Sequence, residues 1–143
     1  MFDLRIGSEP ALRAASIYVR MQVFVLERGI AIDDEFDAND VPGVTYAVIF
    51  DGKTPVATGR FLREDDGSAR LTRIATQADY RGQHLGTQII RALERQAQDL
   101  HIHDIAIHAE VTAIPFYAGL GYHAVSPVYK EDGVPCRVMS RTL

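Results

Sequence analysis

The stretch "DYRGQHLGTQII", Asp79 to Ile90, gives the strongest indication of how this chain folds. It opens with a polar turn that contains Gly82, carries a second glycine at Gly86, and then enters an apolar pattern of helical period. The first amide N–H groups of a helix have no partner within the helix and carry partial positive charge, and glycine lets an anion approach them closely. The stretch is therefore either a phosphate-binding loop or an ordinary turn before a helix.

The segments that flank this stretch favour the phosphate-binding loop. "ARLTRIAT", residues 69–76, is rich in strand-forming residues and predicts a strand. "LGTQIIRALERQAQDL", residues 85–100, predicts an amphipathic helix, one side of which carries Leu85, Ile89, Ala92, Leu93 and Gln96. A strand, a glycine-containing loop and a helix in this order form an anion site, and the charge of Arg81 can pair with phosphate oxygens.

Periodicity along the rest of the chain predicts a mixed α/β fold. We expect strands at 2–6, 44–50, 55–62 and 104–109, a first helix that Ser8 caps and Gly29 ends, a polar loop over 31–44, a short helix over 111–122, and a C-terminal hairpin that turns at Glu131–Gly133. The resulting order is strand, helix, three strands, helix, strand, helix and two strands. It implies both parallel and antiparallel strand pairs within one domain that spans residues 1–143.

Composition and charge exclude several classes of protein. A length of 143 residues, with 47% hydrophobic and 24% charged residues, is typical of one globular domain. The net charge of -4 argues against a nucleic-acid-binding domain, which is usually basic. A single cysteine excludes an internal disulfide, and the chain lacks both a signal-peptide pattern and an apolar run of the roughly 20 residues that a membrane helix needs. We therefore expect a cytoplasmic protein that binds neither nucleic acid nor a membrane.

The residues of the glycine loop resemble a known motif. Residues 81–86, "RGQHLG", are similar to the acetyl-CoA loop of the GNAT-type N-acetyltransferases, which is written Gln/Arg-x-x-Gly-x-Gly/Ala. "RIAT" before the loop resembles the fourth strand of that superfamily, and "AIPFYAGLGY" resembles its later helix and turn. These motifs follow one another in the family's order along nearly the whole chain.

The resemblance implies a fold, an acyl donor and a class of acceptor. The fold would be a central mixed, mostly antiparallel sheet flanked by helices, with a C-terminal β-hairpin. The donor would be acetyl-CoA, and the acceptor would be an amine of a small molecule or of a protein. The backbone of the fourth strand would pair with the pantetheine arm, and the pyrophosphate would lie on the amides of residues 83–87. The residues that would bind the cofactor are Ile74, Ala75, Thr76, Arg81, Gly82, Gln83, His84, Leu85, Gly86 and Thr87.

His84 departs from the motif, because it stands where the family has its middle glycine. Backbone amides bind the phosphates, so a side chain that points away can be tolerated there; alternatively, the imidazole reaches a phosphate itself. A finer resemblance, carried by residues 19–43 and 131–140, is to the ElaA/YjcF-like branch of the superfamily, whose members are mostly assigned as N-acetyltransferases.

Three residues are candidates for the chemistry of acetyl transfer. The hydroxyl of Tyr117, in the family's Phe-Tyr position, can donate a proton to the departing CoA thiolate; the alternative is a core tyrosine that packs beside Phe116. Glu35, in an acidic loop whose crowded carboxylates raise one another's pKa, is a candidate base for the amine. Glu110 is its rival, because the end of the fifth strand in this fold lies near the thioester. The family often has asparagine near this position.

Asp37 and Asp40 have a different expected role. Buried arginines need partners, so we expect these carboxylates to pair with Arg20 or Arg60 and to hold the first helix to the sheet. The same four residues, with Phe24 and Glu35, are also similar to the acyl-homoserine-lactone synthases, which use an acyl-carrier protein donor. Those synthases are longer and usually carry a tryptophan after the first helix, and this chain has no tryptophan.

Other readings of the sequence concern metals, covalent intermediates and partners. His101, His103 and His108 alternate along the chain, but no carboxylate–histidine pattern is evident, so we expect no metal. Cys136 offers an acyl-cysteine route, although direct transfer needs no such intermediate. A protein that binds acetyl-CoA without turnover is a further hypothesis. A homodimer could form if the C-terminal hairpins of two copies pair edge to edge.

Overall fold

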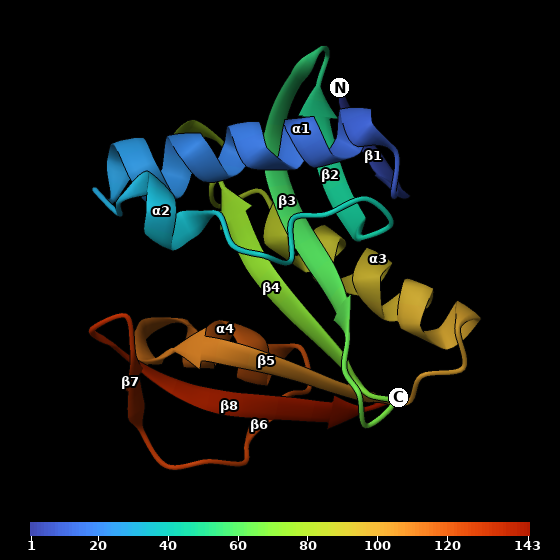
Figure 1. Cartoon of the computed structure of the whole chain (residues 1–143), viewed down its shortest axis with the longest axis vertical. Coiled ribbons are helices and arrows are strands. Elements are labelled where there is room, and N and C mark those ends of the chain that lie inside the picture. The colour runs from blue at the N-terminus through green and yellow to red at the C-terminus, as the bar shows by residue number, and fades with distance from the viewer.

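An eight-stranded sheet runs through the chain in the computed structural model, which describes residues 1–143 (Figure 1). Its strands are β1 (Phe2–Gly7), β2 (Thr45–Asp51), β3 (Thr54–Arg63), β4 (Ala69–Thr76), β5 (Asp104–Glu110), β6 (His123–Ala124), β7 (Tyr129–Glu131) and β8 (Val134–Thr142). Their spatial order is β1-β2-β3-β4-β5-β8-β6, and β7 also pairs with β8. Only β4 and β5 run parallel, so the predicted mixed, mostly antiparallel sheet is confirmed, as is the hairpin of β7 and β8.

Two long helices cover opposite faces of this sheet (Figure 1). Helix α1 (Pro10–Arg20) packs on β2 and β3 from one side, and α3 (Leu85–Asp99) packs on the same strands from the other side. Successive side chains of a strand point to opposite faces, so Ile49 of β2 lies in the core with α3 whereas Val48 lies in the smaller core with α1. The sheet therefore separates two apolar cores.

Shorter helical segments connect these elements and include details that differ from the prediction. They are the π-helical segment η1 (Met21–Glu27), α2 (Ile32–Glu35), η2 (Ala78–Tyr80), η3 (Val111–Ala113) and α4 (Ile114–Gly119). Glu9 rather than Ser8 precedes helix α1, because Pro10 takes the first helical position. The segment 31–44, which we expected to be a loop throughout, contains α2, and the C-terminal region contains the additional strand β6.

Strands β4 and β5 diverge, and the divergence opens the space in which the candidate site lies. They pair only where Ala69–Leu71 meets Ile105–Ile107. Beyond that point Arg73 of β4 has a φ of 53°, and the register with β3 shifts between Thr58 and Arg60. A bulge of this kind bends the strand that contains it. Left-handed backbone at a non-glycine residue is strained, and such strain is concentrated at functional sites.

A network of buried ion pairs ties α1 to the sheet. Arg20 is fully buried and donates two hydrogen bonds to the carboxylate of Asp40, at 2.7 and 2.9 Å. Arg60 is 2% exposed and donates two hydrogen bonds to Asp37, at 2.9 and 3.0 Å, and one to Asp40. The predicted pairing of the two aspartates is confirmed. Burial alone would raise the pKa of Asp40, but hydrogen bonds from Arg20 and Tyr46 hold that pKa well below its usual range.

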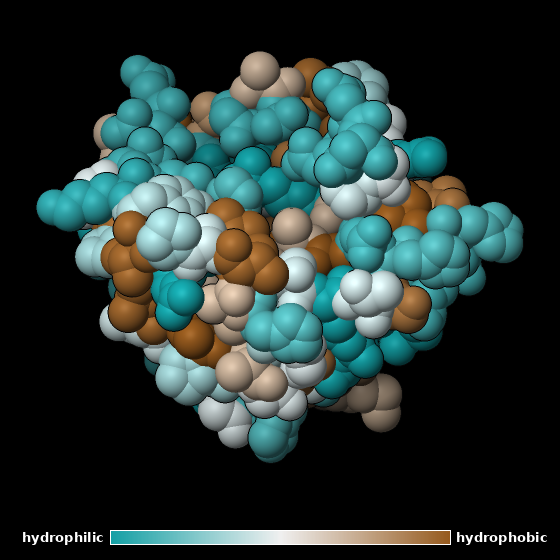
Figure 2. All heavy atoms as spheres, turned by 90° about the horizontal axis from the view of Figure 1, so that it is seen from below, coloured by the Kyte–Doolittle hydropathy of each residue, from teal (hydrophilic) through white to brown (hydrophobic).

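The C-terminal strands leave apolar side chains at the surface. Figure 2 views the molecule from below Figure 1 and shows apolar groups set among polar ones on this face. Between β6 and β7, Val125 and Val128 are 60% and 59% exposed. A homodimer that pairs through these strands stays a prediction.

Candidate active site

Two cavities open where β4 leaves β5, and they meet at shared residues. The first, here named the loop cavity, has a volume of about 520 Å³ and lies between the end of β4 and the start of α3. The second, here named the charged cavity, has a volume of about 620 Å³ and lies between the α1–α2 segment, β4, β5 and the β7–β8 hairpin. Ile74, Ala113 and Tyr117 line both cavities, which therefore adjoin each other at these side chains.

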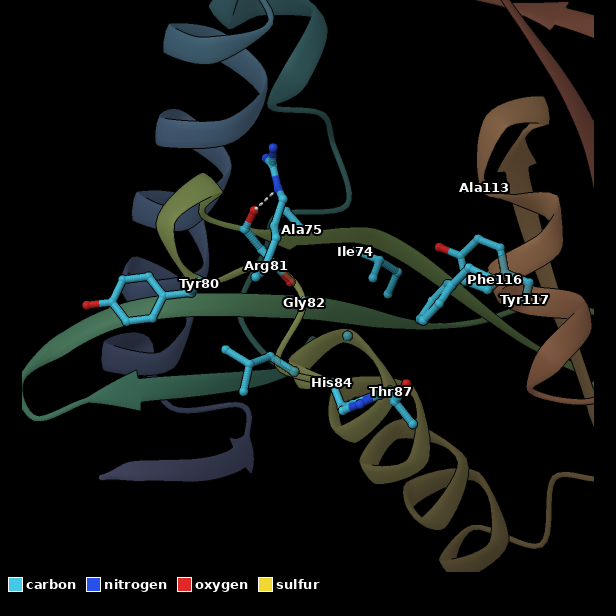
Figure 3. A pocket seen from close by; sticks show the side chains of 13 residues that line it. Ile74, Ala75, Tyr80, Arg81, Gly82, His84, Thr87, Ala113, Phe116 and Tyr117 are labelled. Carbon is cyan, nitrogen blue, oxygen red and sulfur yellow. Dashed lines mark hydrogen bonds between the residues drawn. The ribbon is translucent and has the colours of Figure 1, made fainter.

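The loop cavity is built around the N-terminus of α3 (Figure 3). The preceding loop has two left-handed backbone positions, Gly82 with a φ of 80° and His84 with a φ of 61°. His84 is the N-cap residue of α3, and no side chain caps the helix. The amide N–H groups of the first turn are therefore available to an anion, and the 15-residue helix adds its dipole.

Every residue predicted to bind the cofactor lines the loop cavity except Gln83, whose side chain is exposed. Tyr80, Ala113 and Phe116 line it too. Of these, only Phe116 carries a signal in the sequence, through the Phe-Tyr pair. A β-carbon at Gly86 would lie 3.3 Å from Cζ of Phe116, so this glycine permits the close approach of α3 to α4.

Arg81 points away from the N-terminus of α3 (Figure 3). Its guanidinium donates two hydrogen bonds to the carboxylate of Glu27 in η1, at 2.7 and 2.8 Å, and its Nε donates to the carbonyl of Thr76 at 3.0 Å. The expected pairing of Arg81 with phosphate would require it to leave Glu27. The donors left without a side-chain partner at the start of α3 are backbone amides.

Tyr117 stands where the two cavities meet. It is 7% exposed and points from α4 toward Ile74 on β4 (Figure 3). Its hydroxyl has no hydrogen-bond partner within the chain, and burial together with the nearby carboxylate of Glu110 raises the pKa of Tyr117 above its usual range. A tyrosine that keeps its proton at neutral pH, and has no partner for it, can donate a hydrogen bond to a group bound in the cavity.

The charged cavity gathers side chains from segments that lie far apart in the sequence. The α1–α2 segment contributes Arg28 and Asp34, β4 contributes Arg73, β5 contributes Glu110, and the β7–β8 turn contributes Asp132. Nη2 of Arg28 donates a hydrogen bond to Oε1 of Glu110 at 2.7 Å, although the two residues are 82 positions apart. These side chains are 34% and 36% exposed. No motif in the sequence marks Arg28 or Arg73.

Glu35 lies in the same cavity but is already engaged. It is 3% exposed, and its Oε2 lies 2.9 Å from Nε of Arg20 and 3.2 Å from Nε of Arg73. Burial raises the pKa of Glu35, and the hydrogen bond from Arg20 opposes that rise. These contacts are those of a residue that holds two arginines in place. Glu110 is more exposed and lies next to Tyr117.

Two further groups in the charged cavity are a thiol and an imidazole. Cys136 is 3% exposed, and burial raises the pKa of its thiol, so the thiol keeps its proton at neutral pH. Nδ1 of His108 lies 3.1 Å from the carboxylate of Glu131.

No set of three or more His, Cys, Asp or Glu residues is arranged to hold a metal ion. None of the helices has the length and apolar character required to span a membrane.

The sequence of residues 32–143 matches the family model of the acetyltransferase (GNAT) domain. The chain belongs to this family. An uncharacterized acetyltransferase of Streptococcus pyogenes serotype M1 is 44% identical to this GNAT chain over 110 residues, which make up 77% of the chain and 78% of the relative. The uncharacterized N-acetyltransferase YjcF of Bacillus subtilis is 33% identical over 121 residues, or 84% of this chain and 85% of that protein.

Solved structures share the fold of this GNAT acetyltransferase. Escherichia coli ElaA matches it with a TM-score of 0.85 and 25% identity, covering 99% of both chains. An acyl-CoA N-acyltransferase from Pseudomonas aeruginosa matches with a TM-score of 0.88 and 25% identity, covering 99% of this chain and 100% of the other. The resemblance to the superfamily and to its ElaA/YjcF-like branch is confirmed. The protein is thus an acyltransferase of the class that uses an acyl-CoA donor.

Proposed function

We propose that this GNAT acetyltransferase moves an acetyl group from acetyl-CoA directly to an amine of a small molecule or a protein. The observation that carries the proposal is the junction of the two cavities at Tyr117. The loop cavity offers amides for the phosphates, and the charged cavity offers carboxylates for an amine. A donor and an acceptor bound in the two cavities would meet beside one hydroxyl, and such positioning is a large part of catalysis.

The loop cavity suits the shape of the donor. The pyrophosphate would lie on the amides of residues 83–87 at the start of α3. The pantetheine arm would follow Ile74–Thr76, because the edge of β4 that faces β5 has no strand partner beyond Leu71. This path leads to Tyr117 and would place the thioester at the entrance to the charged cavity.

The reaction would use the carboxylate and the hydroxyl in succession. The acceptor ammonium would first lose a proton to Glu110, which is better placed than Glu35. The side chain of Glu110 is 36% exposed and pairs only with the partly exposed Arg28, whereas Glu35 is buried between two arginines. The amine nitrogen would then attack the thioester carbonyl carbon, so that a C–N bond forms while the C–S bond breaks. Tyr117 would donate its proton to the departing thiolate, and the second proton lost by the nitrogen would restore the tyrosine.

Direct transfer is supported over a covalent intermediate. An acyl-cysteine route would need the thiolate of Cys136, which is the nucleophilic form of that residue. Burial raises the pKa of this thiol and so disfavours the thiolate. The amine itself is then the nucleophile.

An amine panel assayed for free CoA thiol at saturating acetyl-CoA tests the proposal, with calorimetry to measure donor binding. Thiol release together with an acetylated amine, identified by mass spectrometry, is the expected result. Donor binding without release for any amine would instead indicate a binding module without turnover. Release of a lactone from S-adenosylmethionine and an acyl-carrier protein donor would indicate a homoserine-lactone synthase. An absence of acetyl-CoA binding at millimolar concentration would rule out the assignment of the loop cavity.

A further inference from the structure

The walls of the charged cavity are strongly acidic, and this bears on the acceptor if the proposed function holds. Five carboxylates and two guanidinium groups line the cavity, which leaves a formal charge of -3 with histidine neutral. Cavities lined by one sign of charge concentrate ligands of the opposite sign. The carboxylates are those of Asp34, Glu35, Glu110, Glu131 and Asp132, and the guanidinium groups are those of Arg28 and Arg73.

The acidic residues of the cavity differ in whether they have partners. Glu35 is held by two arginines and Glu110 by Arg28. Glu131 lies 3.1 Å from Nδ1 of His108, which is neutral in this count and leaves the charge of Glu131 unbalanced. Asp34 and Asp132 form no ion pair, and both are exposed. They lie on different walls, because Asp34 belongs to α2 and Asp132 to the β7–β8 turn. The cavity therefore has unmatched negative charge away from the pair formed by Arg28 and Glu110.

The group that already pairs with Glu110 indicates what kind of ligand group this carboxylate can bind. The guanidinium of Arg28, a cation, lies 2.7 Å from the carboxylate of Glu110. Both side chains are about a third exposed, and an ion pair of this exposure contributes little to stability, so a ligand ammonium can replace the guanidinium at small cost. Beside it, Tyr117 is 7% exposed and lines the cavity, and its hydroxyl forms no hydrogen bond within the chain. This unpartnered hydroxyl independently indicates that a polar ligand group belongs here.

We propose that the acceptor is a small molecule with two positively charged groups a few carbons apart. One is the primary amine that displaces Arg28 from Glu110 and is acetylated beside Tyr117. The other keeps its proton and stays at the mouth of the cavity with Asp34 or Asp132. Acetylation removes one of the two charges, so the product is held less tightly than the substrate and leaves. A volume of about 620 Å³ lies within the range of roughly 300–1,000 Å³ that is usual for small-molecule pockets.

Other acceptors fit these charges less well. A carboxylate on the acceptor could bind Arg28 once the amine has displaced it, but that arrangement leaves Asp34 and Asp132 unmatched and brings a negative charge into an acidic cavity. A simple alkylamine would use Glu110 alone. Each alternative therefore predicts a different order of preference among amines.

The first arm of the test compares diamines with monoamines of equal length. Straight-chain α,ω-diamines of three to six carbons and the corresponding n-alkylamines are assayed by thiol release, beside α-amino acids and a peptide that contains adjacent lysine and arginine. We expect kcat/KM to be roughly twofold to fivefold higher for the best diamine than for its matched monoamine, because this is what a charge contact at an exposed carboxylate typically contributes. A preference for the peptide over every free diamine would overturn the small-molecule part of the proposal. Equal rates for the two amine series, or a preference for amino acids, would overturn it entirely.

The second arm uses Asp34→Asn and Asp132→Asn. Asparagine keeps the size of the side chain and tolerates the left-handed backbone of Asp132, whose φ is 51°. We expect KM for the diamine to rise by roughly twofold to fivefold in at least one variant, while the monoamine keeps its kinetic constants. Asp65→Asn, an exposed acid in the β3–β4 turn outside both cavities, is the control and should change neither. Equal effects on diamine and monoamine would contradict the second cation site.

Failure of this inference can be told apart from failure of the proposed function. If no amine releases thiol although acetyl-CoA binds, the proposed function fails. Calorimetry of the diamine against the protein with CoA bound then tests the cation site by itself. Diamine binding that Asp34→Asn or Asp132→Asn weakens would uphold the site, and an absence of diamine binding would overturn it.

Discussion

The loop cavity and the charged cavity meet at Tyr117, yet they are built in different ways. Most of the loop cavity comes from one run of chain, residues 74–87, and the anion donors that we propose for it are the backbone amides at the start of α3. The charged cavity comes from four separate segments, and its charges are side chains positioned by ion pairs. The loop cavity should therefore tolerate changes of side chain except at its glycines. The geometry of the charged cavity should depend on residues that hold its lining side chains in place without touching the substrate.

The largest effect should come from removing an arginine behind the charged cavity. Arg20→Ala would leave Asp40 and Glu35 without their main buried partner, and breaking a buried pair in this way typically costs about 3–5 kcal/mol. Urea denaturation followed by circular dichroism measures this loss. Arg5→Ala, which removes an exposed pair with Asp3, is the matched control and should change stability little. A loss below about 1 kcal/mol for Arg20→Ala would mean that the network does not support this wall.

The next effect concerns the residue that the two cavities share. Tyr117→Phe keeps the ring beside Phe116 and removes only the hydroxyl, so folding and acetyl-CoA affinity should change little. Turnover should fall by roughly tenfold to a hundredfold, which is less than usual for general acid catalysis because a thiol is already a fair leaving group. The loss should appear in kcat, because the interaction between the Tyr117 hydroxyl and the CoA sulfur strengthens as negative charge develops on the sulfur. Unchanged turnover in a chemistry-limited assay would return Tyr117 to a packing role.

The contrast between the cavities also explains what the sequence could predict. The loop cavity could be predicted from the sequence because a strand, a glycine turn and an amphipathic helix are local patterns that lie next to one another in the chain. The pairing of Asp37 and Asp40 with Arg20 and Arg60 could also be predicted, because buried charges require partners. The first prediction uses only patterns of neighbouring residues. The second also assumes that the chain has a buried core, but it needs no knowledge of which distant residues are in contact.

The charged cavity could not be predicted in the same way. Arg28 meets Glu110 only after the sheet has brought the α1–α2 segment and the end of β5 together. The bulge at Arg73 has no glycine or proline beside it in β4, and Gly59, which stands opposite the bulge, lies on another strand. Arg81 looked like a phosphate ligand because its partner Glu27 lies 54 positions earlier in the chain. In each case the feature depends on a contact between residues that are far apart in the chain, and no local pattern in the sequence indicates that contact.

A smaller effect should separate the glycines of the loop from its side chains. Gly86→Val would push against Phe116, and Gly82→Val would place a β-branched residue at a φ of 80°, so both should distort the amides that face the anion. We expect acetyl-CoA to bind about tenfold more weakly to either variant, by calorimetry. Gln83→Ala, whose side chain lies outside the cavity, is the control and should bind normally. If His84→Ala proves more damaging than both glycine variants, the imidazole is a phosphate ligand and the backbone account is wrong.

The smallest effect concerns His84, which occupies a left-handed position that suits glycine. Left-handed backbone costs an ordinary residue roughly 1–2 kcal/mol, whereas glycine pays an entropy cost of roughly 0.5–1 kcal/mol on folding. His84→Gly should therefore stabilise the protein by about 0.5–1 kcal/mol, which corresponds to a rise of a few degrees in Tm for a chain of this size. Differential scanning calorimetry measures the shift, and Gln83→Gly, a neighbour without positive φ, should show no gain.

His84→Gly also decides between the two roles of that residue. If amides alone hold the pyrophosphate, the variant should bind acetyl-CoA within about twofold of the parent protein, because the backbone keeps its conformation while only the imidazole is lost. A gain in stability with a marked loss of donor affinity would show that the histidine contributes a hydrogen bond or charge to the phosphates. The loop cavity would then depend on a side chain, as the charged cavity does, and the distinction between backbone and side-chain recognition would not hold at this position.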